Sequence, residues 1–104
     1  MQEKIKAAAM RLLIHKGYEI LDDNYDSLIV ALDDNTIVFL DLIVSDAESG
    51  FKDTDLSREE FESAAINWLI VNHNPTDKAI RFDTICLIPA SEDSAIVRHE
   101  IKRW

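Results

Sequence analysis

The chain has 104 residues, of which 47% are hydrophobic and 30% charged, a composition typical of one globular domain. Twenty acids against eleven bases give a net charge of −9, which argues against a protein that binds phosphate backbones over a broad surface. Its single cysteine, Cys86, excludes an intramolecular disulfide and favours a reducing, cytoplasmic setting. No apolar run approaches the roughly 20 residues of a membrane span, so we expect no membrane partner.

The first half of the chain reads as one helix and three strands. Apolar residues at helical spacing predict a helix over 3–16, and Gly17 follows it where a left-handed cap belongs. Short apolar runs predict strands over 18–21, 28–32 and 37–44, with a hairpin turn at 33–36. The run 37–44 is apolar on both faces, which is typical of a central strand.

The second half reads as a polar loop, one helix and two strands. After the loop 46–56, Ser57 and Glu60 form a capping-box pattern that begins a helix, and this helix is expected to end near Asn72. Strands follow over 80–88 and 95–101, separated by a loop over 89–94. The sequence therefore predicts a single α/β domain over residues 1–104, with a mixed sheet, element order αβββαββ and helices packed against the sheet.

Several strings in this order resemble the YraN-type family of endonuclease-like proteins, which is related to Holliday-junction resolvases. The strings keep the family's order and spacing over nearly the whole chain; they are KGYEILDDNY (16–25), LDDNTIVFLDL (32–42), SAAINWL (63–69), IRFD (80–83) and HEIKRW (99–104). Each string alone is a weak signal, and their collinearity carries the resemblance. The resemblance implies a restriction-endonuclease-like fold.

The resemblance also implies where a nuclease site would lie, and this chain departs from it. Such a nuclease carries a Glu on the first helix, an Asp on the second strand and a Glu-x-Lys on the third, which hold Mg²⁺ and activate a water. The corresponding residues here are Lys6, Leu28, Asp41 and Ile43. One shortened carboxylate of three remains, so we predict a degenerate site with no catalytic residues and no resident metal.

Two interpretations of Asp41 remain open. It is either a surviving metal ligand assisted by Asp26 or Glu48, or a vestigial carboxylate satisfied by hydrogen bonds or by a cation such as Lys6, and the second is favoured because spacing places no further acid beside it.

Four other polar residues match the family strings, namely Asn24, Arg81, Asp83 and His99. Arg81 and Asp83 are two apart on a predicted strand and share a face. They form either a structural pair, which is favoured, or a substrate contact. Cys86 and the three histidines show no nucleophile or zinc spacing, so Cys86 is expected to be a buried structural thiol.

The region that enters the second helix is acidic, where the family usually carries Lys and Arg. Residues 46–62 hold seven acids against Lys52 and Arg58, a charge balance that repels a phosphate backbone. The loop 46–55 lacks the offsets of a calcium-binding loop.

Three functions follow from these patterns. The favoured one is a non-catalytic domain with a nuclease-like fold that acts through protein partners. The second is a divergent nuclease that uses Mg²⁺ or Mn²⁺ at Asp41. The third is a non-cleaving nucleic-acid binder, which would need a basic groove formed by Lys4, Lys6, Arg11, Lys16, Arg98, Lys102 and Arg103. The oligomeric state stays open.

Overall fold

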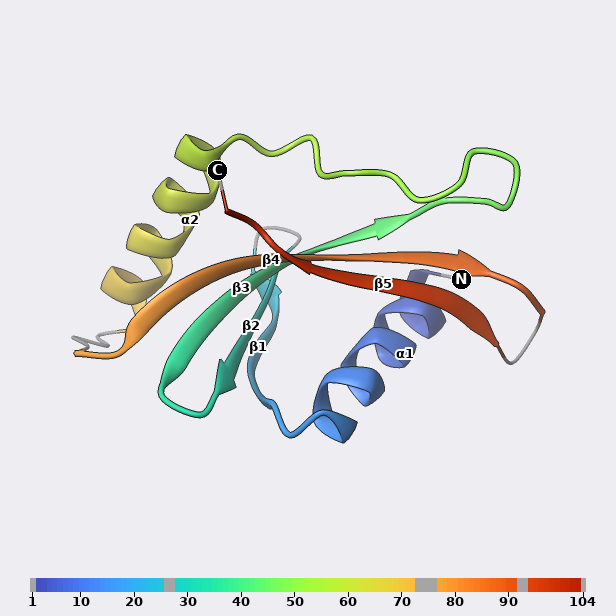
Figure 1. The fold of residues 1–104 in the computed structure, drawn as a ribbon. Coiled ribbons are helices and arrows are strands. Elements are labelled where there is room, and N and C mark those ends of the chain that lie inside the picture. Colours follow the sequence, from blue (N-terminus) through green and yellow to red (C-terminus); the bar gives the residue numbers. More distant parts are fainter. Residues whose placement is uncertain (1, 26–27, 73–76, 92–93, 104) are drawn as a thin grey trace.

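The computed structural model describes residues 2–25, 28–72, 77–91 and 94–103, which form two helices and one five-stranded sheet. Figure 1 shows these elements in chain order, and their bounds are α1 Gln2–His15, β1 Glu19–Tyr25, β2 Leu28–Asp33, β3 Thr36–Val44, α2 Arg58–Val71, β4 Ala79–Pro89 and β5 Ala95–Ile101. The expectation of a mixed α/β sheet with packed helices is confirmed.

The strands lie in the order β1-β2-β3-β4-β5, so that sequence neighbours are also spatial neighbours. All pairs are antiparallel except β3–β4, which is parallel and is connected through α2. Ile37, Val38, Phe39 and Leu40 in β3 are all at most 1% exposed, as expected for a central strand. Since β1 and β5 each have one neighbour, they form the two edges of the sheet.

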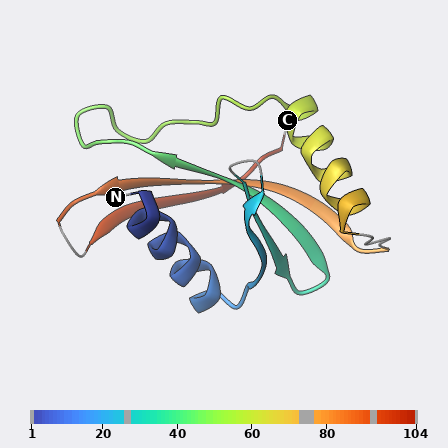
Figure 2. The ribbon, with the colours of Figure 1, turned by 180° about the vertical axis from the view of Figure 1, so that it is seen from behind.

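The two helices cover opposite faces of the sheet, which gives three layers (Figures 1 and 2). On one face, α1 contributes Ala9 and Leu13 to a core with alternate residues of β2, β3 and β4. On the other face, α2 contributes Phe61, Ala65 and Trp68 to a second core. Residues of β3 therefore alternate between an α1 face, which includes Val38 and Leu40, and an α2 face, which includes Ile37, Phe39 and Asp41.

Local signals explain where the helices begin and end. Gly17 adopts a φ of 95°, and the next N–H, of Tyr18, donates to the Leu13 carbonyl at 2.9 Å, so α1 ends in a left-handed cap. At the start of α2, Ser57 Oγ accepts the Glu60 N–H and Glu60 Oε1 accepts the Ser57 N–H, which is the predicted capping box.

The first strand is longer than expected. The prediction of a short strand over 18–21 is wrong at its end, because β1 continues through Asp22, Asp23 and Asn24 to Tyr25. These polar residues are tolerated since β1 is an edge strand and is interrupted by two register shifts against β2. Neither described helix combines the length and the apolar character needed to span a membrane.

Candidate functional site

Three of the four positions that would form a nuclease site lie on the α2 face. Leu28 in β2 is directly opposite Asp41 in β3, and Ile43 lies two residues further along the same face of β3. Lys6 is on α1, which covers the other face, and lines a surface hollow with Ile29 and Leu42. The structure thus separates Lys6 from the other three positions.

Leu28 is part of the apolar core. It is 2% exposed and packs in the cluster that contains Phe39, Phe61 and Trp68. A nuclease would need a carboxylate at position 28 to bind a metal together with Asp41. This chain has the apolar side chain of leucine there instead. Leu28 therefore has a structural role, as part of the apolar core.

Asp41 is half-buried and accepts one short side-chain hydrogen bond. Thr54 Oγ1, from the segment between β3 and α2, donates to Asp41 Oδ2 at 2.5 Å and itself accepts the Leu56 N–H at 3.0 Å. Burial raises the pKa of Asp41, and the Thr54 hydrogen bond partly offsets this while Asp55 adds to it. Of the two expected ways to satisfy this carboxylate, a hydrogen bond or a cation such as Lys6, the structure shows the hydrogen bond, which comes from Thr54.

The acids considered as helpers of Asp41 do not form a cluster with it. Glu48 is exposed in the 46–56 segment, and Asp26 lies outside the described residues. Within the ranges that the structure describes, no group of three or more His, Cys, Asp or Glu side chains is arranged to hold a metal ion. Asp41 with its Thr54 hydrogen bond can accept protons and hydrogen bonds, but alone it supplies too few oxygen ligands for Mg²⁺.

Three of the four other family-matching residues meet on the α1 face. The carboxylate of Asp83, 0% exposed, accepts hydrogen bonds from Arg81 Nε and Nη2, both at 2.9 Å, and from His99 Nε2 at 2.7 Å. Asn24 lies apart at the end of β1, where its N–H donates to Asp22 Oδ1.

Two further residues accept hydrogen bonds from Arg81. Its Nη1 donates to Asp33 Oδ2 at 3.1 Å, and its Nη2 also donates to the Tyr18 hydroxyl at 2.7 Å. The Asp83 hydrogen bonds are the largest cause of a raised Arg81 pKa, whereas burial raises the pKa of Tyr18. Hydrogen bonds to two carboxylates and a phenol engage four of the five N–H donors of Arg81 and leave one Nη1 hydrogen, so this arrangement favours the structural pair over a substrate contact.

The tautomer of His99 follows from its two partners. Lys16 Nζ lies 3.0 Å from His99 Nδ1, and an ammonium can only donate, so Nδ1 accepts. The proton is then on Nε2, which donates to Asp83. His99 therefore bridges Lys16, just after α1, and the buried carboxylate.

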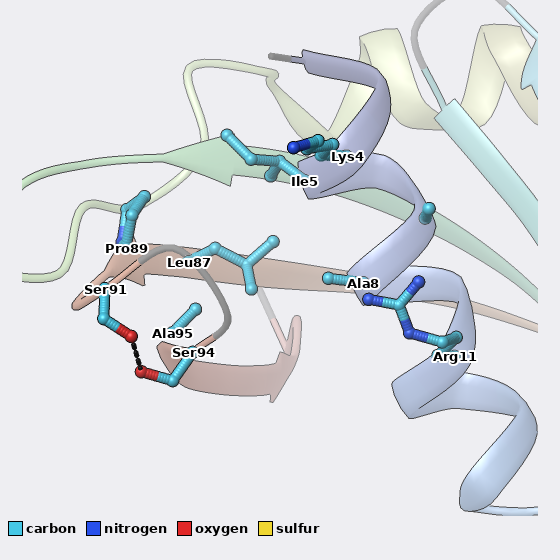
Figure 3. Close-up of a pocket in the computed structure, with 10 residues that line it drawn as sticks. Lys4, Ile5, Ala8, Arg11, Leu87, Pro89, Ser91, Ser94 and Ala95 are labelled. Atoms are coloured by element: carbon cyan, nitrogen blue, oxygen red, sulfur yellow. Dashed lines mark hydrogen bonds between the residues drawn. The ribbon is translucent and has the colours of Figure 1, made fainter.

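The basic residues that a nucleic-acid binder would need in one groove lie in separate places. Lys4 and Arg11 line a 360 Å³ hollow between α1 and the β4–β5 hairpin, opposite the Ser91 and Ser94 hydroxyls, which are 2.7 Å apart (Figure 3). Lys102 and Arg103 line a different hollow beside α2 and Phe82, on the other face. Of the remaining three, Lys6 lines the hollow with Ile29 and Leu42, Lys16 contacts His99, and Arg98 forms an ion pair with Glu100.

The acidic segment between β3 and α2 is held against the α2 face of β4 and β5. The Lys52 N–H donates to the Sγ of Cys86, which is buried as predicted, and the Lys102 ammonium binds the Asp53 carboxylate at 3.0 Å and lowers its pKa. Arg98 lies over the Phe51 ring, with its Cζ 5.0 Å from the ring centroid. The negative charge of this segment is therefore held over the α2 face of the sheet.

A scan against protein-family models and a search of curated proteins found no match to this chain. The YraN-type resemblance thus remains a prediction from the collinear strings.

Proposed function

We propose that this chain is a non-catalytic domain with a YraN-type, restriction-endonuclease-like scaffold that acts in the cytoplasm through a protein partner. The observation that carries the proposal is the face around Asp41: Leu28 opposite it is a buried core residue, and Ile43 replaces the lysine that would orient a water. A scaffold that keeps its sheet and replaces its metal ligands with packing residues is expected to function by binding.

The proposed partner surface is the outer stripe of α2. Ile66 and Ile70 are one turn apart and are 56% and 65% exposed, although isoleucine is among the most frequently buried residue types. Glu62 lies one turn before Ile66 and Glu59 lies two turns before it, on the same side of the helix, and both carry negative charge. This stripe fits a partner with an apolar centre and a basic rim.

The test of lost catalysis is a cleavage assay on branched, single-stranded and duplex DNA with Mg²⁺ and with Mn²⁺. We expect no cleavage by the wild type, because one half-buried carboxylate is not a metal site. The control is Asp41→Ala: cleavage that is present in the wild type and absent in this variant would show that Asp41 is a metal ligand and would establish the nuclease instead.

The test of the partner surface compares cross-linked cell extracts of the wild type with those of the double variant Ile66→Ser/Ile70→Ser. The matched control is Ile14→Ser, which removes an isoleucine that is 59% exposed on α1. We expect one protein to be captured by the wild type and the control and lost with the double variant. If capture is the same for all three proteins, the α2 stripe is not the partner surface.

A further inference from the structure

The sheet has two edges of different character. At the β1 edge, register shifts between Ile20 and Asp22 and between Asp22 and Tyr25 interrupt the ladder, and such irregularities protect an edge from pairing with another strand. At the β5 edge, seven consecutive residues pair with β4 without a shift. Two large apolar side chains of this strand, Ile96 and Ile101, are exposed. The β5 edge is therefore the regular one, with an uninterrupted ladder.

The hydrogen bonds of β5 define which backbone groups are free to pair outward. The Lys102 N–H donates to the Phe82 carbonyl at 2.8 Å, and in an antiparallel ladder such hydrogen-bonded pairs recur at every second residue. Residues 96, 98 and 100 therefore bond to β4. The N–H and C=O groups of 95, 97, 99 and 101 point away from the sheet.

From this pattern we infer that β5 pairs with β5 of a second copy of the chain, antiparallel and centred on His99, to make one continuous sheet across a two-fold axis. In this register the outward backbone groups of the two His99 residues bond each other. Val97 pairs in the same way with Ile101 of the partner subunit. A symmetric dimer needs such a self-complementary surface.

Charge selects this register over its neighbours. Centred on His99, Arg98 is opposite Glu100 of the partner subunit, and the symmetry repeats this pair. Within one chain, Arg98 Nε already lies 2.8 Å from Glu100 Oε1, so the two copies together form a square of alternating charge. A register centred on Arg98 or on Glu100 would instead place like charges opposite each other, which is destabilising.

The interface is small and its affinity is correspondingly modest. One seven-residue strand per copy supplies the contact, and each chain carries a net charge of −9 that opposes association. We expect a dimer that forms in the micromolar range rather than at lower concentrations. This inference is independent of the proposed partner surface, because β5 and the outer stripe of α2 share no residue.

Sedimentation velocity over a concentration series tests the inference, with charge variants as the discriminating step. Wild type is expected to move from monomer to dimer as concentration rises. Arg98→Glu alone and Glu100→Arg alone are each expected to remain monomeric, since each places like charges opposite each other. A mixture of the two single variants is expected to form a heterodimer, and the double variant Arg98→Glu/Glu100→Arg is expected to form homodimers again.

Backbone amide exchange supplies a second readout. In the wild type, the amides of Val97, His99 and Ile101 should become more protected as concentration rises, while those of Ile96 and Arg98, already bonded to β4, should change little. The control Ile70→Ser should dimerise like the wild type. A wild type that stays monomeric throughout the series, or a dimer that survives in both single charge variants, would overturn the inference.

Discussion

The fully buried carboxylate of Asp83 holds the Arg81 guanidinium through two parallel hydrogen bonds, although the two residues are only two positions apart on β4. Because both side chains are on the α1 face, the pair also reaches Asp33 of β2, His99 of β5 and Tyr18, which lies between α1 and β1. This is the most connected polar group in the described part of the chain, and it joins the N-terminal half of the fold to the C-terminal hairpin.

Asp83→Asn is expected to destabilise the fold by about 3 kcal/mol. Removing one member of a buried ion pair leaves the other charge poorly compensated. The expected loss of stability is at the lower end of the usual range for such pairs because Arg81 still forms its ion pair with Asp33. Urea unfolding would measure it. The matched control is Arg58→Ala, which removes the exposed pair with Glu62 and should cost less than about 1 kcal/mol. Equal, small effects of the two substitutions would contradict a structural role for the Asp83 network.

Much of this polar group could be predicted, and the rest depends on tertiary placement. Spacing put Arg81 and Asp83 on one face of a strand, because side chains alternate along β-strands. Their contacts with Asp33 and His99 depend on β4 lying between β3 and β5, which includes a parallel pairing across α2 that the local pattern does not define. Asn24 matches the same family strings but lies apart at the β1 edge.

The same distinction applies to Asp41. The sequence placed it on a central apolar strand and showed that no carboxylate was spaced to join it. It could not show that Thr54, thirteen residues later, would donate to Asp41, because that contact requires the polar segment 46–56 to return over the sheet. Capping signals at Ser57 and Gly17 were predicted correctly since they depend on neighbouring residues alone.

DNA binding at physiological salt is expected to be weak. The acidic segment lies over the α2 face, and the basic side chains are spread over separate places on both faces, so few phosphates can be contacted at once. Fluorescence anisotropy with duplex and branched DNA would measure the affinity and its salt dependence. A sub-micromolar dissociation constant with a steep salt slope would imply several phosphate contacts and contradict this expectation.

Asp41→Asn is expected to leave stability unchanged or slightly raised at neutral pH. Burial raises the Asp41 pKa above its unfolded value, so the ionised carboxylate opposes folding at neutral pH and the protonated form does not. The difference between wild type and variant should therefore vanish as pH falls through the folded and then the unfolded pKa. Unfolding titrations at several pH values would check this. A loss of several kcal/mol at neutral pH would instead indicate a cationic partner left unpaired in the variant.

Melting curves of wild type and Asp41→Asn, each with and without about 5–10 mM Mn²⁺, test whether the scaffold has a working metal site, because this range would saturate a weak site. A metal bound at Asp41 in the folded state, at a hundred times its dissociation constant, would add about 2.7 kcal/mol of stability. In a domain of this size that raises the melting temperature by more than about 10 °C. We expect no such shift in either protein. A rise in the wild type that disappears in Asp41→Asn would contradict this expectation and restore a metal-dependent nuclease.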